Sequence, residues 1–275
     1  METQKEMKYN ESSNNGSILR GWLWVILIGS ILFLGSSVYM LVVSWEQIIS
    51  PNTFINIYNL IAQMLPPDFT VVSGIGVAVL ETIAMSVMAT FLSVIIAFPL
   101  SFLAASNTSP HPSIQAAVKA IFNILRTIPE LIMGIIFVAA VGFGILPGIL
   151  ALGLSSVGML GKFYAEAIEK VDKGLNEAVQ SAGGSRFHII IFSIIPQVIS
   201  HSVDFSLYRW EHNFRASTVV GLIGAGGLGF ELISSLRLLQ YQEVLAILII
   251  VFVLVQLVDT FGNVIRRKLL EGERI

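Results

Sequence analysis

One segment of the chain, residues 197–220, carries polar side chains at a spacing that could do chemistry inside an apolar helix. The positions advance in alternating steps of four and three residues, which places them on a single helical face. The members are Gln197, His201, Asp204, Tyr208, Glu211, Arg215 and Thr218. Within one helix, Asp204 can reach Tyr208 one turn on, and Glu211 can pair with Arg215. We call this series the polar stripe.

The polar stripe has two possible interpretations. Charged groups cost several kcal/mol at the centre of a bilayer unless they are paired or face water, so the stripe belongs in a subunit interface or a water-filled path. It is then either a buried network that fixes helix packing, or a translocation pathway in which Arg209 or Arg215 meets an anion. The planar fork of arginine matches the oxygens of phosphate-like anions.

A catalytic reading of the same segment is weaker. His201 and Asp204 lie near Ser202 and Ser206, but residues one to five positions apart on one helix do not give nucleophile, base and orienting group their required geometry. Unchanged transport in His201→Ala would count against such catalysis. We therefore predict that this chain is not an enzyme and contains no catalytic residue.

Two glycine-rich motifs resemble nucleotide sites but lack essential parts. Gly224-x-Gly226-x-x-Gly229 has no preceding strand of a βαβ unit, so its glycines are better explained by close helix contact or by non-helical backbone. The Gly158–Lys162 segment has Phe163 where a phosphate-binding loop needs Ser or Thr. No ATP site is predicted, and any ATP dependence must come from a partner.

Composition defines the kind of protein that holds these residues. The chain is 55% hydrophobic and 12% charged, against roughly 25% charged residues in soluble domains, and its mean hydropathy is +0.80. An all-α polytopic membrane protein in contact with the lipid bilayer is expected. The net charge of −2 argues against nucleic-acid binding, and zero cysteines with four scattered histidines predict no disulfide and no metal site.

Hydropathy and the positive-inside rule give about six transmembrane helices with both termini in the cytoplasm. The expected organisation is a disordered cytoplasmic tail (1–19), a first transmembrane anchor (20–43), an external loop with an amphipathic segment (44–80), a transmembrane domain (81–265) that contains a cytoplasmic loop (163–190), and a cytoplasmic C-terminal tail (266–275). Later spans are expected over 82–105, from Arg126 to Gly161 as two helices that meet near Gly144–Gly148, from Phe187, and over 244–264.

The cytoplasmic loop holds a polar island that ends where a span begins. Its Glu177-to-Ser181 part is compatible with a short water-facing helix, which Gly183 would end through a left-handed cap. Ser185 can then cap a second helix. Two short helices with a sharp break at this place indicate a surface on which a cytosolic partner docks.

Glu177-Ala178-x4-Gly183, with Pro196 thirteen residues later, resembles the EAA loop of ABC-importer permeases. Val179 and Ser193 depart mildly from the usual pattern. Four further segments resemble phosphonate ABC-transporter permeases: Pro66–Asp68, Arg126–Glu130, Gly158–Glu169 and Glu211–Gly229.

The resemblance implies a type I ABC importer permease fold in the bacterial inner or plasma membrane. It implies a homodimer, two cytosolic ABC ATPase subunits that hold ATP and Mg²⁺, and an extracytoplasmic substrate-binding protein. Glu177 and Ala178 would contact the ATPase, Gly183 would make the bend and Pro196 would set the start of the fifth span. The pathway and gate would include Asp204, Tyr208, Glu211, Arg215, Gly224, Gly226 and Gly227.

Two questions stay open at the level of sequence. The cargo could be a phosphonate, phosphite, hypophosphite or a phosphate ester. The main alternative function is a gradient-driven secondary transporter of a small anion, which would explain the charges in the membrane but has no need of an EAA-like element.

Overall fold

The computed structural model describes residues 22–40 and 50–271, and these residues form helices and turns without a strand. The chain divides into two compact units, Met1–Gln63 and Met64–Ile275. In the first unit lie a helix over Trp22–Met40 and most of α2 (Pro51–Met64), the amphipathic segment expected from sequence; neither buries a residue. The predicted tail over residues 1–19 lies outside the described residues.

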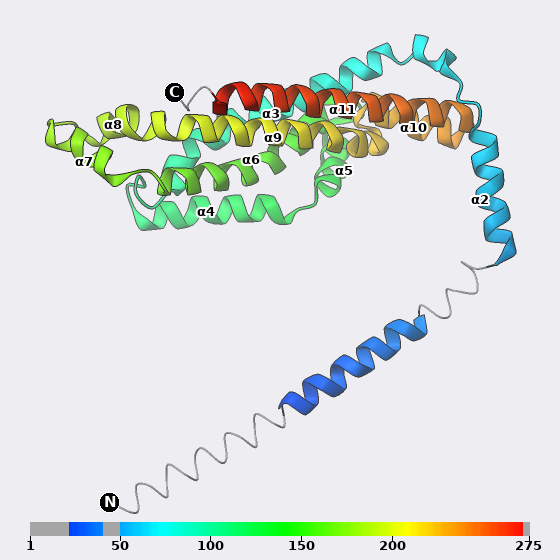
Figure 1. Cartoon of the computed structure of the whole chain (residues 1–275), viewed down its shortest axis with the longest axis horizontal. Coiled ribbons are helices and arrows are strands. Elements are labelled where there is room, and N and C mark those ends of the chain that lie inside the picture. The colour runs from blue at the N-terminus through cyan, green and yellow to red at the C-terminus, as the bar shows by residue number, and fades with distance from the viewer. Residues whose placement is uncertain (1–21, 41–49, 272–275) are drawn as a thin grey trace, which may run out of the picture. The chain divides into compact units, whose positions relative to one another are not determined.

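The second unit is a helical body in which long helices run alongside one another (Figure 1). Its elements are η1 (Phe69–Ser73), α3 (Gly76–Ala104), α4 (Pro112–Thr127), α5 (Glu130–Val141), α6 (Ile145–Glu169), α7 (Lys173–Ser181), α8 (Arg186–Ile189), η2 (Ile190–Ile194), α9 (Ile195–Val220), η3 (Gly221–Ala225), α10 (Gly227–Arg237) and α11 (Tyr241–Glu271). The first of these follows Asp68, whose carboxylate accepts a hydrogen bond from the backbone N–H of Thr70 at 2.9 Å. That bond holds the pKa of the Asp68 carboxyl below its usual range.

The central helix of this unit is α6, which packs against α3, α4, α5 and α9. Small residues on α6 allow these close approaches. A Cβ at Gly158 would lie 2.8 Å from the backbone oxygen of Phe122 on α4, and a Cβ at Gly161 would collide with the Phe122 ring. The core is therefore built around a helix whose glycines let neighbouring helices contact its backbone directly.

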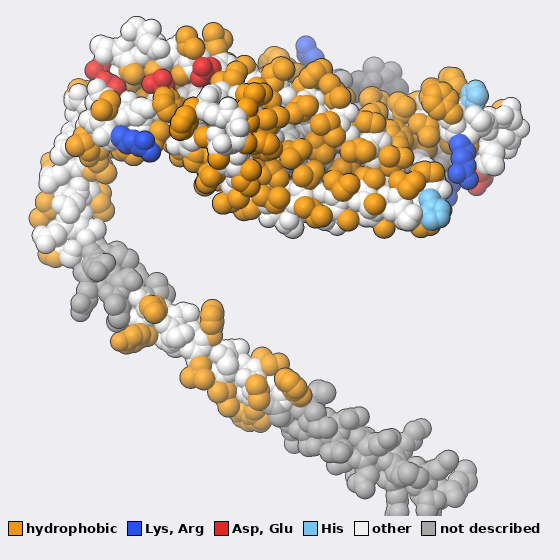
Figure 2. Space-filling model, turned by 180° about the vertical axis from the view of Figure 1, so that it is seen from behind, with side chains coloured by type: hydrophobic (Ala, Val, Ile, Leu, Met, Phe, Trp, Pro, Cys, Tyr) orange, Lys and Arg blue, Asp and Glu red, His pale blue; other side chains and the backbone are white. Residues whose placement is uncertain are grey.

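Five helical runs within residues 22–40 and 50–271 are long and apolar enough to cross a membrane, and α4 with α5 gives a sixth if that bent pair is one span. The predicted number of about six is confirmed. On the face of the second unit seen in Figure 2, hydrophobic side chains cover the middle and charged side chains gather mainly at the two ends. Such a distribution suits a body that sits in a bilayer.

The third span differs from the prediction. The sequence indicated one span that begins at Arg126, but residues 112–127 form α4, which meets α5 at 89°. Pro129 disfavours helical backbone at Ile128, whose ψ is 120°. With 12 residues, α5 is only about 18 Å long and cannot cross a hydrocarbon core of about 30 Å alone.

The expected break after this span is present. Helix α5 ends at Val141, and α6 begins at Ile145 after Gly142 and Gly144, whose φ angles of +93° and +128° favour glycine. A smaller difference concerns α3, which begins at Gly76 rather than near Thr82 because the helix continues through Glu81 instead of stopping at its charge.

Candidate translocation and coupling sites

The polar island forms the expected exposed helix with a sharp end. Glu177 and Ala178 are exposed on α7, which buries none of its residues. The N–H of Gly183 donates to the Gln180 oxygen at 2.9 Å and that of Gly184 to the Val179 oxygen at 3.0 Å, with φ of +83° at Gly183. These two bonds are a Schellman motif. The left-handed glycine break is confirmed.

The connection from α7 to α9 differs in one detail from the prediction. Ser185 stands at the N-cap of α8, but its hydroxyl lies 2.7 Å from Nδ1 of His188 and does not cap a backbone amide. The π-helical turn η2 follows. The backbone N–H of Ile195, the residue after this turn, donates to the backbone oxygen of Ile190. Pro196 falls in the first turn of α9, where its missing N–H matters least.

Two polar contacts connect α7 and its N-cap residue to η2 and to the first turn of α9. The hydroxyl of Ser193 donates to Oδ1 of Asn176 at 2.8 Å. The backbone N–H of Asp172, at the N-cap of α7, donates to Oε1 of Gln197 at 2.9 Å. Gln197, the first member of the polar stripe, therefore contacts the residue at the N-cap of α7.

The polar stripe is paired with α11 and not along its own helix, so the predicted contacts of Asp204 with Tyr208 and of Glu211 with Arg215 are wrong. Arg266 of α11 lies between Asp204 (Nε–Oδ1 2.6 Å) and Glu211 (Nη2–Oε1 3.2 Å). Arg215 pairs with Asp259 at 2.7 Å. Long side chains on an adjacent helix reach these groups more directly than neighbours on the same helix.

The other stripe residues occupy different surroundings. His201 and Tyr208 are exposed, and the hydroxyl of Thr218 is buried without a hydrogen-bond partner among the described residues. Gly262 of α11 leaves room for the Glu211 carboxylate, which a Cβ at that position would strike. The structure thus pairs Asp204, Glu211 and Arg215 with α11, and Tyr208 is not part of these pairs.

A second polar series runs along the opposite face of α9, and of its members only Arg209 was predicted to meet an anion. It consists of Ser202, Ser206, Arg209, Asn213 and Ser217. Four of these five residues are buried and Ser206 is half-buried. Their steps of four, three, four and four residues are the same signal that identified the polar stripe. We call this set the buried series.

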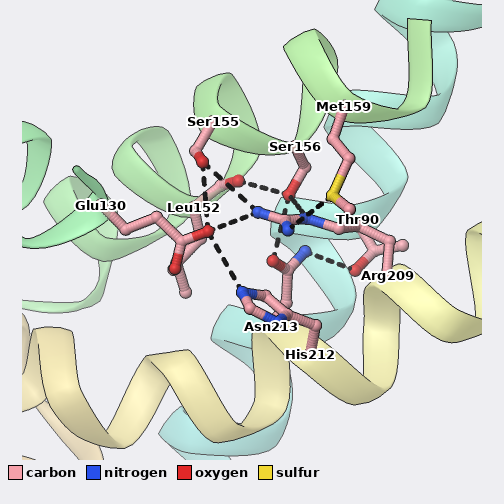
Figure 3. A network of polar contacts seen from close by, with 9 residues as sticks. All are labelled: Thr90, Glu130, Leu152, Ser155, Ser156, Met159, Arg209, His212 and Asn213. Atoms are coloured by element: carbon pink, nitrogen blue, oxygen red, sulfur yellow. Dashed lines mark hydrogen bonds and ion pairs between the residues drawn. The ribbon is translucent and has the colours of Figure 1, made fainter. Parts of the chain in front are cut away.

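Arg209 is the centre of a network that joins four helices (Figure 3). Its Nε donates to Oγ of Ser156 at 2.7 Å, and its Nη1 lies 3.3 Å from Sδ of Met159, both on α6. Ser156 Oγ lies 3.0 Å from Oδ1 of Asn213, whose amide donates to Oγ1 of Thr90 on α3 at 2.9 Å. The guanidinium is thereby fixed from two sides.

Glu130, the first residue of α5, supplies the charge that balances Arg209. Its Oε1 accepts from Nη2 of Arg209 at 2.5 Å and from Oγ of Ser155 at 3.1 Å, and lies 3.3 Å from Nε2 of His212. The Glu130 and His212 side chains are 23% and 39% exposed, against 4% for Arg209. The network is therefore closed on the arginine side and open on the carboxylate side.

The glycine run after α9 has the non-helical backbone that the sequence predicted. Gly224, Gly226 and Gly227 have φ of +101°, +79° and +69°. The N–H of Gly227 donates to Oε2 of Glu81 at 2.8 Å, and that of Leu228 to Oγ1 of Thr82 at 2.9 Å. The helix dipole favours an anion at the start of a helix, so the Glu81 carboxylate is stabilised at the start of α10. Glu81 was not among the predicted site residues.

Residues 97–271 match the family model described as the inner membrane component of binding-protein-dependent transport systems. This segment includes α7, α9 and the glycine run. The chain belongs to this family. It is thus a multi-pass permease of the inner membrane.

Two relatives of this permease are named for the transport of phosphite and of phosphate. It is 50% identical over 216 residues to the phosphite transport system permease protein PtxC of Stutzerimonas stutzeri, with 78% of each chain covered. It is 42% identical over 219 residues to the phosphate-import permease protein PhnE of Mycolicibacterium smegmatis, covering 80% of this chain and 41% of that protein. Among solved structures, the MetNI methionine ABC transporter matches with a TM-score of 0.63 and 22% identity over 74% of this chain and 99% of that chain, which confirms the permease fold.

Proposed function

We propose that this permease moves a phosphorus oxyanion, phosphite or a phosphonate, into the cell as the transmembrane subunit of an ATP-driven importer. The observation that carries the coupling part is α7, an exposed helix that a left-handed glycine ends immediately before the longest helical run of the chain. The names of PtxC and PhnE support the cargo class.

The proposed partners are a second copy of this chain, two cytosolic ABC ATPase subunits and an extracytoplasmic binding protein. A nucleotide-binding loop with its lysine and hydroxyl residue is missing from this sequence, so ATP and Mg²⁺ would be held by the ATPase. The homodimer is proposed because a single chain offers one coupling helix, whereas two ATPase subunits would each need one.

In this scheme Glu177 and Ala178 contact the ATPase, while Gly183 and Pro196 set the angles at which α7 and α9 follow one another. Asp204, Glu211 and Arg215 hold α9 to α11 beside the pathway. Tyr208 would face the pathway. Gly224, Gly226 and Gly227 supply the bend of the gate.

The experiment reconstitutes the complex in proteoliposomes and measures ATP hydrolysis and phosphite uptake with and without loaded binding protein. Gly183→Pro is expected to abolish stimulation by the binding protein, because φ of +83° is closed to proline. Glu177→Arg is expected to reduce it without affecting folding, since this side chain is exposed. Lys268→Ala, which removes an exposed cation of α11 and leaves α7 unchanged, is the control.

Three outcomes separate the possibilities. Loss of stimulation in both coupling variants, with the control unchanged, supports the coupling role of α7. Native-like stimulation in Gly183→Pro would refute it. Uptake that follows an ion gradient in vesicles lacking the ATPase subunits would replace the proposal with secondary transport.

A further inference from the structure

The strongest unexplained feature is the convergence of three hydrogen-bond donors on one oxygen. Nη2 of Arg209, Oγ of Ser155 and Nε2 of His212 all lie within 3.3 Å of Oε1 of Glu130 (Figure 3). A planar guanidinium with a hydroxyl and an imidazole beside it is an arrangement that can bind carboxylate and phosphate-like oxygens alike. The Glu130 oxygen therefore stands where the oxygen of an external anion could be held.

We infer that Arg209, His212 and Ser155 form an oxyanion-binding site of the translocation pathway, which Glu130 occupies as an internal ligand until the cargo displaces it. The inference rests on the proposed function. It adds to that function the residues that would hold the phosphorus oxyanion and the group that would compete with it.

Arg209, the charged donor of the site, does not depend on Glu130 alone for its position. Arg209 keeps its bond to Ser156, which is fully buried, and Asn213 links this serine to Thr90. These bonds come from α3, α6 and α9. When the carboxylate leaves, the guanidinium remains oriented, so an incoming anion finds a preorganised donor.

The carboxylate side is connected differently. Glu130 begins the 12-residue α5, which follows the 89° bend at Pro129 and ends at the two left-handed glycines. Short helices between non-helical joints can move as rigid bodies by changes at a few backbone angles. Glu130 therefore belongs to the part of the network best able to withdraw.

Contacts connect α5 to the glycine run. The N–H of Gly144 donates to the oxygen of Gly224 at 3.1 Å. A Cβ at Gly134 of α5 would lie 2.6 Å from the side chain of Ile223, so α5 and η3 are in close contact. Displacement of α5 would thus reach the proposed gate, and anion binding would be coupled to a change at Gly224.

Electrostatics supports an exchange of one anion for another. An arginine buried to this degree in a membrane protein needs a negative partner at all times. Glu130 supplies it in the empty site, and the cargo would supply it in the loaded site. The 23% and 39% exposure of Glu130 and His212 marks the side from which the cargo would arrive.

The test measures binding of radiolabelled phosphite and of inorganic phosphate to the ATPase–permease complex in nanodiscs, without binding protein or ATP. Glu130→Gln is expected to bind the anions about tenfold more tightly than the native complex, because the competing carboxylate is removed. Adding Arg209→Gln should abolish this gain. Glu166→Gln, which removes an exposed carboxylate paired with Lys162 on α6, should bind as the native complex does.

Two results would overturn the inference. One is an affinity of folded Glu130→Gln within about twofold of native. The other is native uptake by the charge-swapped pair Glu130→Arg with Arg209→Glu, which would show that pairing alone matters. If Glu130→Gln does not assemble, Glu130→Asp decides the question: its carboxylate is one methylene shorter, and an unchanged affinity would also refute internal competition.

A separate uptake assay keeps the two proposals apart. If the native complex with its binding protein and ATP takes up neither phosphite nor methylphosphonate, the proposed cargo is wrong. The comparison of Glu130→Gln with the native complex still decides whether Glu130 is an internal ligand, since it uses the anions directly.

Discussion

The two polar faces of α9 hold their charges in different ways. On the face toward α6, Arg209 is almost fully buried and is bound by a carboxylate, two hydroxyls and a thioether. On the face toward α11, Arg215 is 43% exposed and has one ion-pair partner in the described part of the chain. Arg266 lies between these extremes, since it is shared by two carboxylates.

The difference shows that one helix can combine a rigid electrostatic centre with an adjustable contact. Buried charges tolerate no loss of a partner, because an uncompensated charge is left in a low-dielectric surrounding. Exposed pairs contribute little, because water replaces the lost partner. We therefore expect the α6 face to fix α9 and the α11 face to permit small movements.

The largest effect is expected from Arg209→Ala. This change leaves the Glu130 carboxylate without its cation, and the free energy of unfolding should fall by about 3–5 kcal/mol. Unfolding of the purified permease in mixed micelles measures it. The control is Arg209→Met with Glu130→Gln, which removes both charges and should recover most of the loss; no recovery would mean that packing, not charge, dominates this face.

A smaller effect is expected from Arg266→Ala. Glu211, whose side chain is 10% exposed, and Asp204 both lose their charged partner, so the loss should be about 1–3 kcal/mol. Arg266→Lys should recover only part, because an ammonium group cannot reproduce the fork that reaches both carboxylates. The same unfolding assay applies, and full recovery by lysine would contradict the bridging role.

Arg215→Ala should change the unfolding free energy by about 0–1 kcal/mol, because its pair with Asp259 is partly exposed. High salt should reduce the difference further through screening. A loss as large as that of Arg209→Ala would remove the distinction between the two faces.

The smallest effect is expected at Asp68. This residue lies outside the candidate spans and serves as a reference for the charged groups on both faces of α9. The pKa of its carboxyl is lowered by the hydrogen bond from Thr70, so its contribution to holding η1 is complete above the ordinary carboxyl pKa of about 3.9 and is lost as the pH falls through the lower folded value. Hydrogen exchange at the Thr70 amide measures it. Asp68→Asn should remove the pH dependence, and persistence of that dependence would assign it to another group.

Local breaks in the backbone were predicted well, and the partners of charged side chains were not. The Gly183 break and the non-helical glycines depend on local backbone preferences, which the sequence states directly. The partner of Arg209 lies 79 residues away at Glu130, and no spacing rule indicates such a pair. The stripe residues pair with Arg266 and Asp259 because α9 packs against α11, and the periodicity of one helix does not reveal how it packs against another.

Helix α4 shows the same limit. Because the third span was predicted to begin at Arg126, the helix over Pro112–Thr127 was missed, although Pro112 is a good first helical residue and Val118 and Phe122 lie one turn apart on a buried face. The recess on α6 that receives Phe122 exists because of Gly161, and only the packed structure shows it. The series that includes Arg209 had a readable period and could have been found.

The continuous helical run over Arg186–Ala225 has a mechanical consequence. Its 40 residues make a rod of about 60 Å, with α7 attached at one end and Gly224 at the other. In the proposed importer, a push on α7 would first pass the turn at Gly183 and Gly184, which two backbone hydrogen bonds hold, and would then travel along this run without crossing another loop. In this scheme the π-helical turn η2 lies just before Pro196, near the α7 end of the run, so its stiffness would set how much of a motion at α7 arrives at the glycine run.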